Sequence, residues 1–161
     1  MEKATFAAGC FWHVQDAFIN LPGVVEAVAG YTGGHTVNPT YEQVCSHATG
    51  HAEAVEIKFD PKKISFEKLL SKFWEIHDPT TLNRQGLDIG SNYRSAIFYH
   101  SDEQKKIAEE ASEQAQKRFK DKIVTEIMPA GPFYKAEEYH QNYYQKHGIS
   151  SCELPQEKLT N

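Results

Sequence analysis

Cysteine is scarce in this sequence: its 161 residues include only Cys10, Cys45 and Cys152. Three is an odd number and too small for the paired framework that holds a small secreted domain together. We therefore expect a reducing compartment, the cytoplasm. In that setting cysteines carry out redox chemistry, bind a metal or pack in the core.

Long apolar runs are also missing. No stretch approaches the ~18 consecutive apolar residues that a membrane span requires, and the N-terminus has no basic segment followed by a long apolar run. Lysines and arginines are scattered along a chain of net charge −5. A nucleic-acid backbone attracts the opposite pattern, a clustered basic surface. We expect neither a membrane nor a nucleic acid as partner, and a ligand that is small or peptidic.

The chain shows neither internal repeats nor low-complexity segments, and its size suits one core. Forty per cent of its residues are hydrophobic, and a chain of 161 residues buries roughly 68–70% of its unfolded surface. Only the last dozen residues lack periodicity. We predict a single domain over residues 1–161, with 148–161 as a mobile C-terminal tail, and a monomer.

Hydrophobic periodicity divides the chain into strands and helices. Two patterns stand out: His51 to Phe59 alternates between faces, and apolar residues from Phe66 to Ile76 recur every three or four positions. The predicted strands cover 4–8, 24–31, 51–59, 93–99 and 123–128, and the predicted helices 11–18, 66–76, 101–119 and 136–146. The first six elements follow the order of a split βαβ arrangement. We predict an α+β two-layer sandwich with a ferredoxin-like core, an added C-terminal helix and an extended tail.

Cys10 lies between a strand pattern and a helix pattern, in Gly9-Cys10-Phe11-Trp12. This position puts its thiol at a helix N-terminus, where backbone N–H groups lack partners and carry partial positive charge. Such a setting lowers a thiol pKa from about 8.5 toward about 7 and favours a nucleophilic thiolate. The alternative is a buried, inert cysteine, because free cysteine is among the most buried residue types.

Glu53 is the second candidate, because strand alternation places it on the same face as the apolar Val55 and Ile57. Burial disfavours the charged form of a carboxyl group and raises its pKa, so Glu53 could hold a proton near pH 7 and act as a general acid. The alternative is a half-buried residue at the strand end, bonded to a neighbour.

Aromatic residues gather near these two candidates. Phe11 and Trp12 directly follow the thiol, and the loops carry four phenols, those of Tyr31, Tyr41, Tyr93 and Tyr99. Any single tyrosine is more often a core or rim residue, so the argument depends on several of them converging. Apolar rings together with phenol donors suit a ligand that has an apolar methyl end and one strongly accepting oxygen. Asp88 lies in a glycine-punctuated loop, where an acid either forms a turn through local bonds or belongs to the site.

The other cysteines leave two possibilities open. On the predicted tail, Cys152 could reach an oxidised catalytic sulfur and resolve a sulfenic acid as a disulfide. Cys45 is interpreted as structural or incidental, although Cys45, His47 and His51 together could ligate zinc with Cys10 or His35 as a fourth ligand. Their spacing is only loosely like that of a zinc site.

The sequence shares many motifs with one protein family, in the same order and across nearly the whole chain. They are Gly9-Cys10-Phe11-Trp12, Ala29-Gly30-Tyr31-Thr32-Gly33-Gly34, Asn38-Pro39-Thr40-Tyr41, Thr49-Gly50-His51-Ala52-Glu53-Ala54-Val55, His77-Asp78-Pro79-Thr80, Arg84-Gln85-Gly86, Tyr93-Arg94-Ser95 and Pro132-Phe133-Tyr134. The sequence closely resembles the A-type peptide methionine sulfoxide reductases. It departs from many members at His13, where they carry a small residue, and at Leu87, where they carry Asn.

The resemblance implies reduction of the S epimer of methionine sulfoxide, free or in proteins, without metal or organic cofactor. It implies that Cys10 attacks, that Glu53 protonates the sulfoxide oxygen, and that this oxygen binds to two phenols, Tyr41 and Tyr93. In the same way Phe11 and Trp12 would form the methyl pocket and Asp88 would orient the substrate backbone. Cys152 would then form a disulfide with Cys10 for a thioredoxin-type reductant to open.

Two other functions remain possible from the sequence. A thiol-based redox sensor or peroxidase could use the same Cys10 and Cys152, and a zinc-binding module could use Cys45 with the histidines. Formation of free methionine from its sulfoxide with a dithiol separates the reductase from both.

Overall fold

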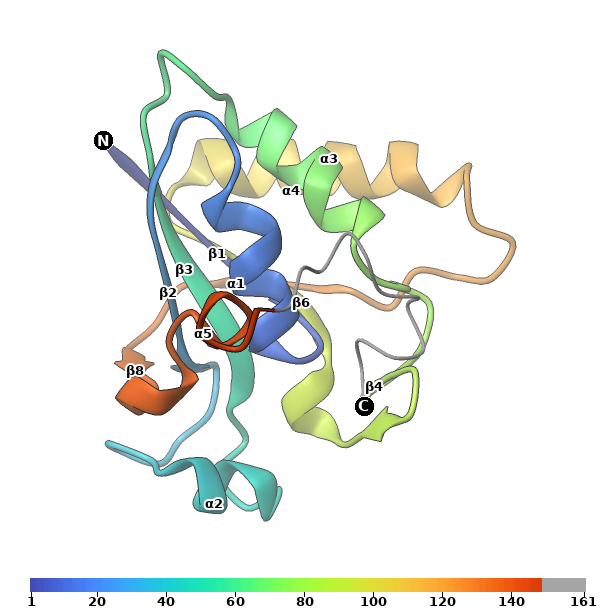
Figure 1. The fold of residues 1–161 in the computed structure, drawn as a ribbon. Helices are drawn as coiled ribbons and strands as arrows, with labels where there is room; N and C mark the ends of the chain where they lie inside the picture. Colours follow the sequence, from blue (N-terminus) through green and yellow to red (C-terminus); the bar gives the residue numbers. More distant parts are fainter. Residues whose placement is uncertain (149–161) are drawn as a thin grey trace.

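The computed structural model describes residues 1–148, which form a mixed α/β fold around one six-stranded sheet (Figure 1). The strands of this sheet are β1 (Glu2–Ala8), β2 (Val24–Thr32), β3 (Ala52–Phe59), β6 (Ser95–Tyr99), β7 (Glu126–Pro129) and β8 (Phe133–Lys135). The helices are α1 (Phe11–Ile19), α2 (Tyr41–Cys45), α3 (Phe66–Glu75), α4 (Asp102–Gln116) and α5 (Tyr143–Lys146). Among the described helices, none has the length and apolar character needed to cross a membrane.

The sheet has the strand order β7-β6-β1-β3-β2-β8. Neighbouring strands in this sheet are antiparallel, with the exception of the parallel pair β6 and β7. A separate two-stranded hairpin, β4 (Arg84–Gln85) with β5 (Asp88–Ile89), lies in the loop before β6. The four inner strands, β6-β1-β3-β2 in the sheet, occur along the chain in the order β1, β2, β3 and β6. Helix α1 lies between β1 and β2, and α3 lies between β3 and β6.

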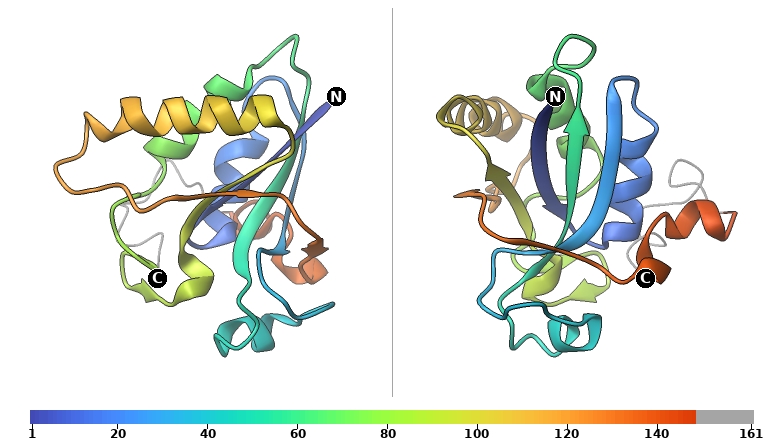
Figure 2. Two further views of the ribbon diagram at one scale, coloured as in Figure 1. Left: turned by 180° about the vertical axis from the view of Figure 1, so that it is seen from behind. Right: turned by 90° about the vertical axis from the view of Figure 1, so that its left-hand side faces the viewer.

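Helices α1, α3 and α4 cover one face of the sheet, and the chain that leads from β7 to β8 crosses the other face (Figure 2). The main core lies on the helix face, where Phe6 of β1 stacks on Phe18 of α1 at 5.3 Å and contacts Phe73 of α3 at 5.2 Å between ring centroids. On α3, buried side chains recur every three or four positions because one stripe of a helix faces the core.

The opposite face of the sheet carries small residues, since the crossing chain packs closely on it. A second cluster there consists of four alanines and Phe98, with Ala130 and Phe133 against it. At Gly30 of β2 an added Cβ would lie 2.5 Å from the backbone oxygen of Tyr134. Only glycine therefore fits at this position beside β8.

The register of β1 and β3 creates the candidate site. Phe6 lies opposite Val55, so Glu53, two residues earlier on β3, lies level with the end of β1, just before Cys10. The loop at residues 78–94 closes over the same end of the sheet, as the contacts of β3 with the 3-10 turn Ser91–Tyr93 show.

The C-terminal region differs from its sequence prediction. Instead of one helix over 136–146, the chain forms a 3-10 turn at Glu138–His140, adopts a left-handed conformation at Asn142 (φ 55°) and only then enters α5. Long-range bonds cause this break: the Gln141 side chain bonds to both backbone groups of Ala29, and the amide of Asn142 donates to Gln15. The predicted tail over 148–161 lies, apart from Gly148, outside the described residues.

Candidate active site

Cys10 occupies the N-cap position of α1, directly after a turn that only glycine adopts easily. Gly9 has φ 93°, and an added Cβ would meet the Gln85 side chain at 2.8 Å. Cys10 is half-buried and its side chain makes no capping bond. The backbone N–H groups of Trp12 and His13 lie close enough to its sulfur to lower the pKa of the thiol. The structure thus places the thiol at the helix N-terminus, as the sequence predicts.

The ionisation of Cys10 differs from the expectation. Burial raises the pKa of the thiol well above its ordinary value, and the nearby negative charge of Glu53 raises it further. The N–H groups of Trp12 and His13 lower it by less. The prediction of a depressed pKa was wrong because loss of water around the sulfur outweighs the helix N-terminus. Neutral Glu53 removes the repulsion and leaves the N–H groups to stabilise a thiolate.

Glu53 is buried, with 1% of its surface exposed. Its Oε1 accepts a 3.3 Å hydrogen bond from the N–H of Phe11, and its Oε2 a 3.5 Å bond from the Asn92 side chain. Burial raises the pKa of its carboxyl group to about 8, and the charge of Asp88 adds to this effect. Glu53 therefore holds a proton at neutral pH, beside the residue that follows Cys10.

Tyr41 and Tyr93 reach the same place from two different loops. Tyr41 begins α2, whose N-terminus is closed by a capping box of Thr40 and Gln43, and its hydroxyl lies near the sulfur of Cys45. Tyr93 ends the 3-10 turn before β6. Burial raises the pKa of both phenols, and the charge of Glu53 raises it further in both. Both hydroxyls consequently keep their protons and can donate hydrogen bonds toward the carboxyl group.

Phe11 and Trp12 form an aromatic cluster with His140 and Tyr143. Trp12 stacks on Tyr143 with 3.7 Å between ring centroids and 7° between planes, and its Nε1 donates a 2.9 Å hydrogen bond to Nδ1 of His140. Because Nδ1 accepts, the proton of neutral His140 lies on Nε2, and burial lowers the pKa of this histidine. Phe11 packs at 5.1 Å from the same imidazole. The indole of Trp12 is thereby fixed on one face by Tyr143 and at its N–H edge by His140.

Asp88 opens β5 of the small hairpin and is half-buried. Burial raises its pKa to about 6, and its charge in turn raises the pKa values of Cys10, Glu53 and Tyr93, so it borders the same site. The Gln85 side chain bonds to both backbone groups of residue 78 and holds this loop against Gly9.

The two positions that depart from the family pattern differ in exposure. Leu87, at the tip of the hairpin, is 69% exposed. His13 is buried and its Nε2 bonds to the backbone oxygen of Ile76 at 2.9 Å. The His13 side chain is therefore held inside the fold, whereas Leu87 lies at the surface.

Sequence reasoning missed or misjudged four residues near the site. Glu137 accepts a 2.8 Å bond from the Tyr31 hydroxyl and a 2.9 Å bond from the amide of Tyr41. Asn92 bonds to Glu53, while His140 holds Trp12. Cys45, read as incidental, contacts the Tyr41 hydroxyl. Of these four residues, only Asn92 could have been suspected from the sequence, because it directly precedes Tyr93.

The zinc alternative has no support in the structure. His51 is bonded at both ring nitrogens, since Nδ1 accepts from the amide of Gly34 and Nε2 lies 2.7 Å from the backbone oxygen of Thr36. Within residues 1–148, no cluster of three or more histidine, cysteine or acidic side chains has a metal-binding arrangement. Cys152 lies outside the described residues.

A partly exposed thiol beside a protonated carboxyl group and two phenols defines a thiol-dependent oxidoreductase. The family model described as "Peptide methionine sulfoxide reductase" matches residues 2–161, and the chain belongs to this family. A relative named peptide methionine sulfoxide reductase MsrA, from Methanothermobacter thermautotrophicus, is 59% identical over 155 residues, which cover 95% of this chain and 92% of the relative.

Solved structures agree with this assignment. Methionine sulfoxide reductase A of Corynebacterium diphtheriae has a TM-score of 0.88 at 38% identity, over 91% of this chain and 75% of that one. Mxr1 from Saccharomyces cerevisiae in reduced form has a TM-score of 0.87 at 37% identity, covering 91% and 86%. The same yeast protein in complex with Trx2 gives 0.64 at 30% identity, covering 88% and 84%.

Proposed function

We propose that this protein reduces methionine S-sulfoxide, free or in proteins, to methionine. The observation that carries the proposal is the buried, protonated carboxyl group of Glu53, bonded to the amide of the residue after Cys10. Family membership and the named relatives support the same reaction.

The reaction needs an acid and a sulfur nucleophile at one place. A sulfoxide sulfur is attacked poorly until its oxygen receives a proton, and Glu53 supplies this proton while the Cys10 thiolate attacks. Oxygen passes from the substrate to the thiol: Cys10 becomes a sulfenic acid and methionine leaves, so Cys10 is oxidised as the sulfoxide is reduced. Hydroxyls of Tyr41 and Tyr93 donate hydrogen bonds to the sulfoxide oxygen, which carries negative charge until the proton arrives.

The aromatic cluster supplies substrate recognition. Phe11 and Trp12 contact the methyl group on the substrate sulfur, and the bonds of Trp12 to His140 and Tyr143 keep this pocket preformed. Asp88, at the border of the site, orients the backbone of the substrate. No cofactor or metal takes part in any of these steps.

Recycling completes the cycle. Cys152 attacks the sulfenic acid, water leaves, and a Cys10–Cys152 disulfide forms; a thioredoxin-type reductant then reduces it. The yeast relative solved with Trx2 supports a partner of this class.

We also propose the finer description of the fold and its setting. The order β6-β1-β3-β2, antiparallel throughout, supports a ferredoxin-like core within the larger sheet, and the continuous core supports a single catalytic domain over residues 1–161. Three cysteines support a cytoplasmic setting, and the chain acts as a monomer.

The decisive experiment supplies separated S and R epimers of methionine sulfoxide with dithiothreitol and measures methionine formed. We expect methionine from the S epimer alone, and none from Cys10→Ser. Consumption of hydrogen peroxide without methionine would instead indicate the peroxidase alternative.

A further inference from the structure

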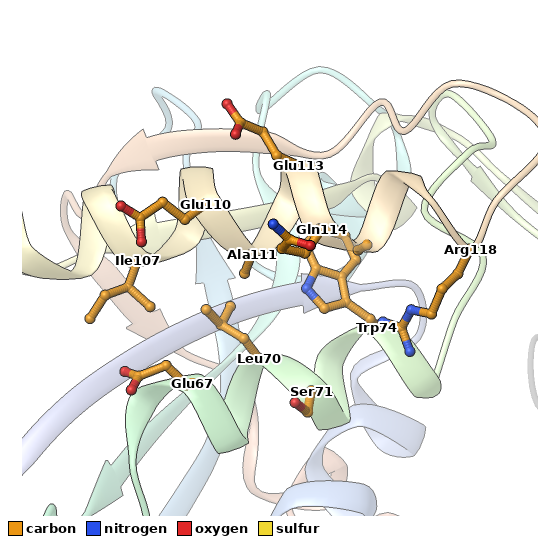
Figure 3. A pocket seen from close by; sticks show the side chains of 11 residues that line it. Glu67, Leu70, Ser71, Trp74, Ile107, Glu110, Ala111, Glu113, Gln114 and Arg118 are labelled. Carbon is orange, nitrogen blue, oxygen red and sulfur yellow. The ribbon is translucent and has the colours of Figure 1, made fainter.

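A groove runs between helices α3 and α4, on elements that contribute nothing to the site around Cys10. Its larger cavity, of about 620 Å³, is floored by Leu70, Trp74 and Ala111 (Figure 3). A second cavity of about 420 Å³ adjoins it and shares Glu67 and Ile107 with it. The two together form an elongated depression, with each part in the size range of ligand sites.

The floor contains a polar group without a partner. Trp74 is 96% buried, and its Nε1 has no hydrogen-bond partner within the described residues. Figure 3 shows the nitrogen edge of the indole turned toward Leu70 and Ala111, into the groove. A buried N–H group without an acceptor is unfavourable and uncommon. A ligand that displaces the side chains over this atom and places a carbonyl oxygen there would satisfy it.

The walls of the groove are acidic. Glu67 of α3 and Glu110 of α4 lie on opposite sides of Ile107, and neither takes part in the ion pairs found in residues 1–148 (Figure 3). Five carboxylates and two cations line the two cavities: Glu2, Glu67, Glu103, Glu110 and Glu113 against Lys3 and Arg118. Lys3 is already paired with Glu56. The groove therefore favours a cationic occupant.

We propose that this groove is a second, non-catalytic binding site for a short peptide segment in which a lysine or arginine lies next to apolar side chains. The apolar side chains cover Leu70 and Ala111, the cation lies between Glu67 and Glu110, and a backbone carbonyl accepts the Trp74 N–H. A peptide fits this groove because one chain carries all the matching groups. Its length suits the elongated shape, its apolar side chains suit the floor, its cation suits the carboxylates, and its carbonyl groups suit the unpartnered indole N–H.

The indole N–H of Trp74 provides a direct test. Trp12 and Trp74 are the only tryptophans, so the ¹⁵N-labelled protein gives two indole signals, assigned by Trp74→Phe. On addition of the capped peptide acetyl-Leu-Lys-Leu-Lys-Leu-amide, we expect the Trp74 proton to move downfield and the Trp12 signal to stay in place. The same peptide with glutamate for lysine is the control and should leave both signals unchanged.

Two variants test the charge and the shape of the groove separately. Glu67→Gln with Glu110→Gln should weaken binding about fivefold, in line with two exposed ion pairs, and Ala111→Leu should abolish it by filling the floor. Glu109→Gln, on the exposed side of α4, is the matched control. Reduction of free methionine sulfoxide should remain unchanged in each, which separates this site from the proposed function.

Three results would overturn the proposal. They are an unmoved Trp74 signal at millimolar peptide, equal binding of the glutamate peptide, or unchanged affinity in both groove variants.

Discussion

The amide of Phe11 donates a hydrogen bond to Oε1 of Glu53, a residue 42 positions away on β3. This bond ties the acid to the first turn of the helix that presents the thiol. Rotation of α1 would therefore disturb both the position of Cys10 and the pKa of Glu53. The proposed nucleophile and the proposed proton donor are thus held in a fixed relative position.

Glu53→Gln should slow the step that forms the sulfenic acid by about 10²–10⁴-fold, because it removes a general acid. Single-turnover rates with excess enzyme thiol, measured by methionine release at pH 7, give this value. Glu56→Gln is the matched control, since Glu56 lies on the same strand and is only paired with Lys3 at the surface. Equal loss in both variants would point to damage of β3 rather than to proton transfer.

The pH profile of the same step follows from the pKa values. The rate should rise with pH as Cys10 ionises, and the rise should stop at about pH 8, where Glu53 loses its proton. In Glu53→Gln no such group titrates, so the rise should continue past pH 8. A break at the same pH in the variant would assign it to another group.

Glu53 should also link stability to pH. Its pKa is raised in the folded protein to about 8, whereas an unfolded glutamate titrates at about 4.3. Its contribution is complete below about pH 4.3 and is lost as pH rises to 8, a change on the order of 5 kcal/mol in the free energy of unfolding. The buried His77, with a pKa lowered to about 4, has the opposite dependence.

Comparison with a variant isolates this contribution from that of His77. Urea unfolding of the wild type and of Glu53→Gln at pH 5 and pH 8 should show a variant that gains relative stability at the higher pH. An identical difference at both pH values would contradict the raised pKa.

His140→Phe should raise KM for methionine sulfoxide about five- to tenfold while kcat changes less. Phenylalanine keeps the ring packing on Phe11 and Tyr41 but leaves the Trp12 N–H without its acceptor, a loss of about 1 kcal/mol or more. Steady-state kinetics with dithiothreitol measure both constants. Tyr139→Phe, at an exposed neighbouring ring, serves as the control. A fall in kcat with constant KM would place His140 in the chemical step instead.

Cys152→Ser should leave one turnover intact and abolish further turnover with thioredoxin. Peptide mapping after turnover without reductant should find a Cys10–Cys152 disulfide in the wild type and a sulfenic acid in the variant. Cys45→Ser is the control and should retain the disulfide. Mapping of Cys10 to Cys45 would refute the recycling step.

Local sequence patterns predicted the parts of the site that depend on nearby residues. The β1-to-α1 junction at Gly9 and Cys10, and the inward face of Glu53, follow from short-range periodicity and turn chemistry. The prediction of one C-terminal helix was wrong because hydrogen bonds from Gln141 to Ala29, 112 positions away, interrupt the helix. The contact of His140 with Trp12 could not be predicted for the same reason, since the two residues lie far apart in the sequence.

The direction of the Cys10 pKa was misjudged for a related reason. Backbone N–H groups next to the thiol can be inferred from the sequence, but the depth of its burial depends on distant parts of the chain, such as the loop at residues 78–94, whose Gln85 lies against Gly9. Desolvation is a property of the assembled fold, and here it exceeds the local effect.

The stack of Tyr143 on Trp12 has a consequence for the end of the chain. It anchors α5 beside the substrate pocket, and the described structure ends at Gly148, only two residues after this helix. Any displacement of α5 would therefore shift the indole of Trp12 and the backbone that leads to Gly148 together.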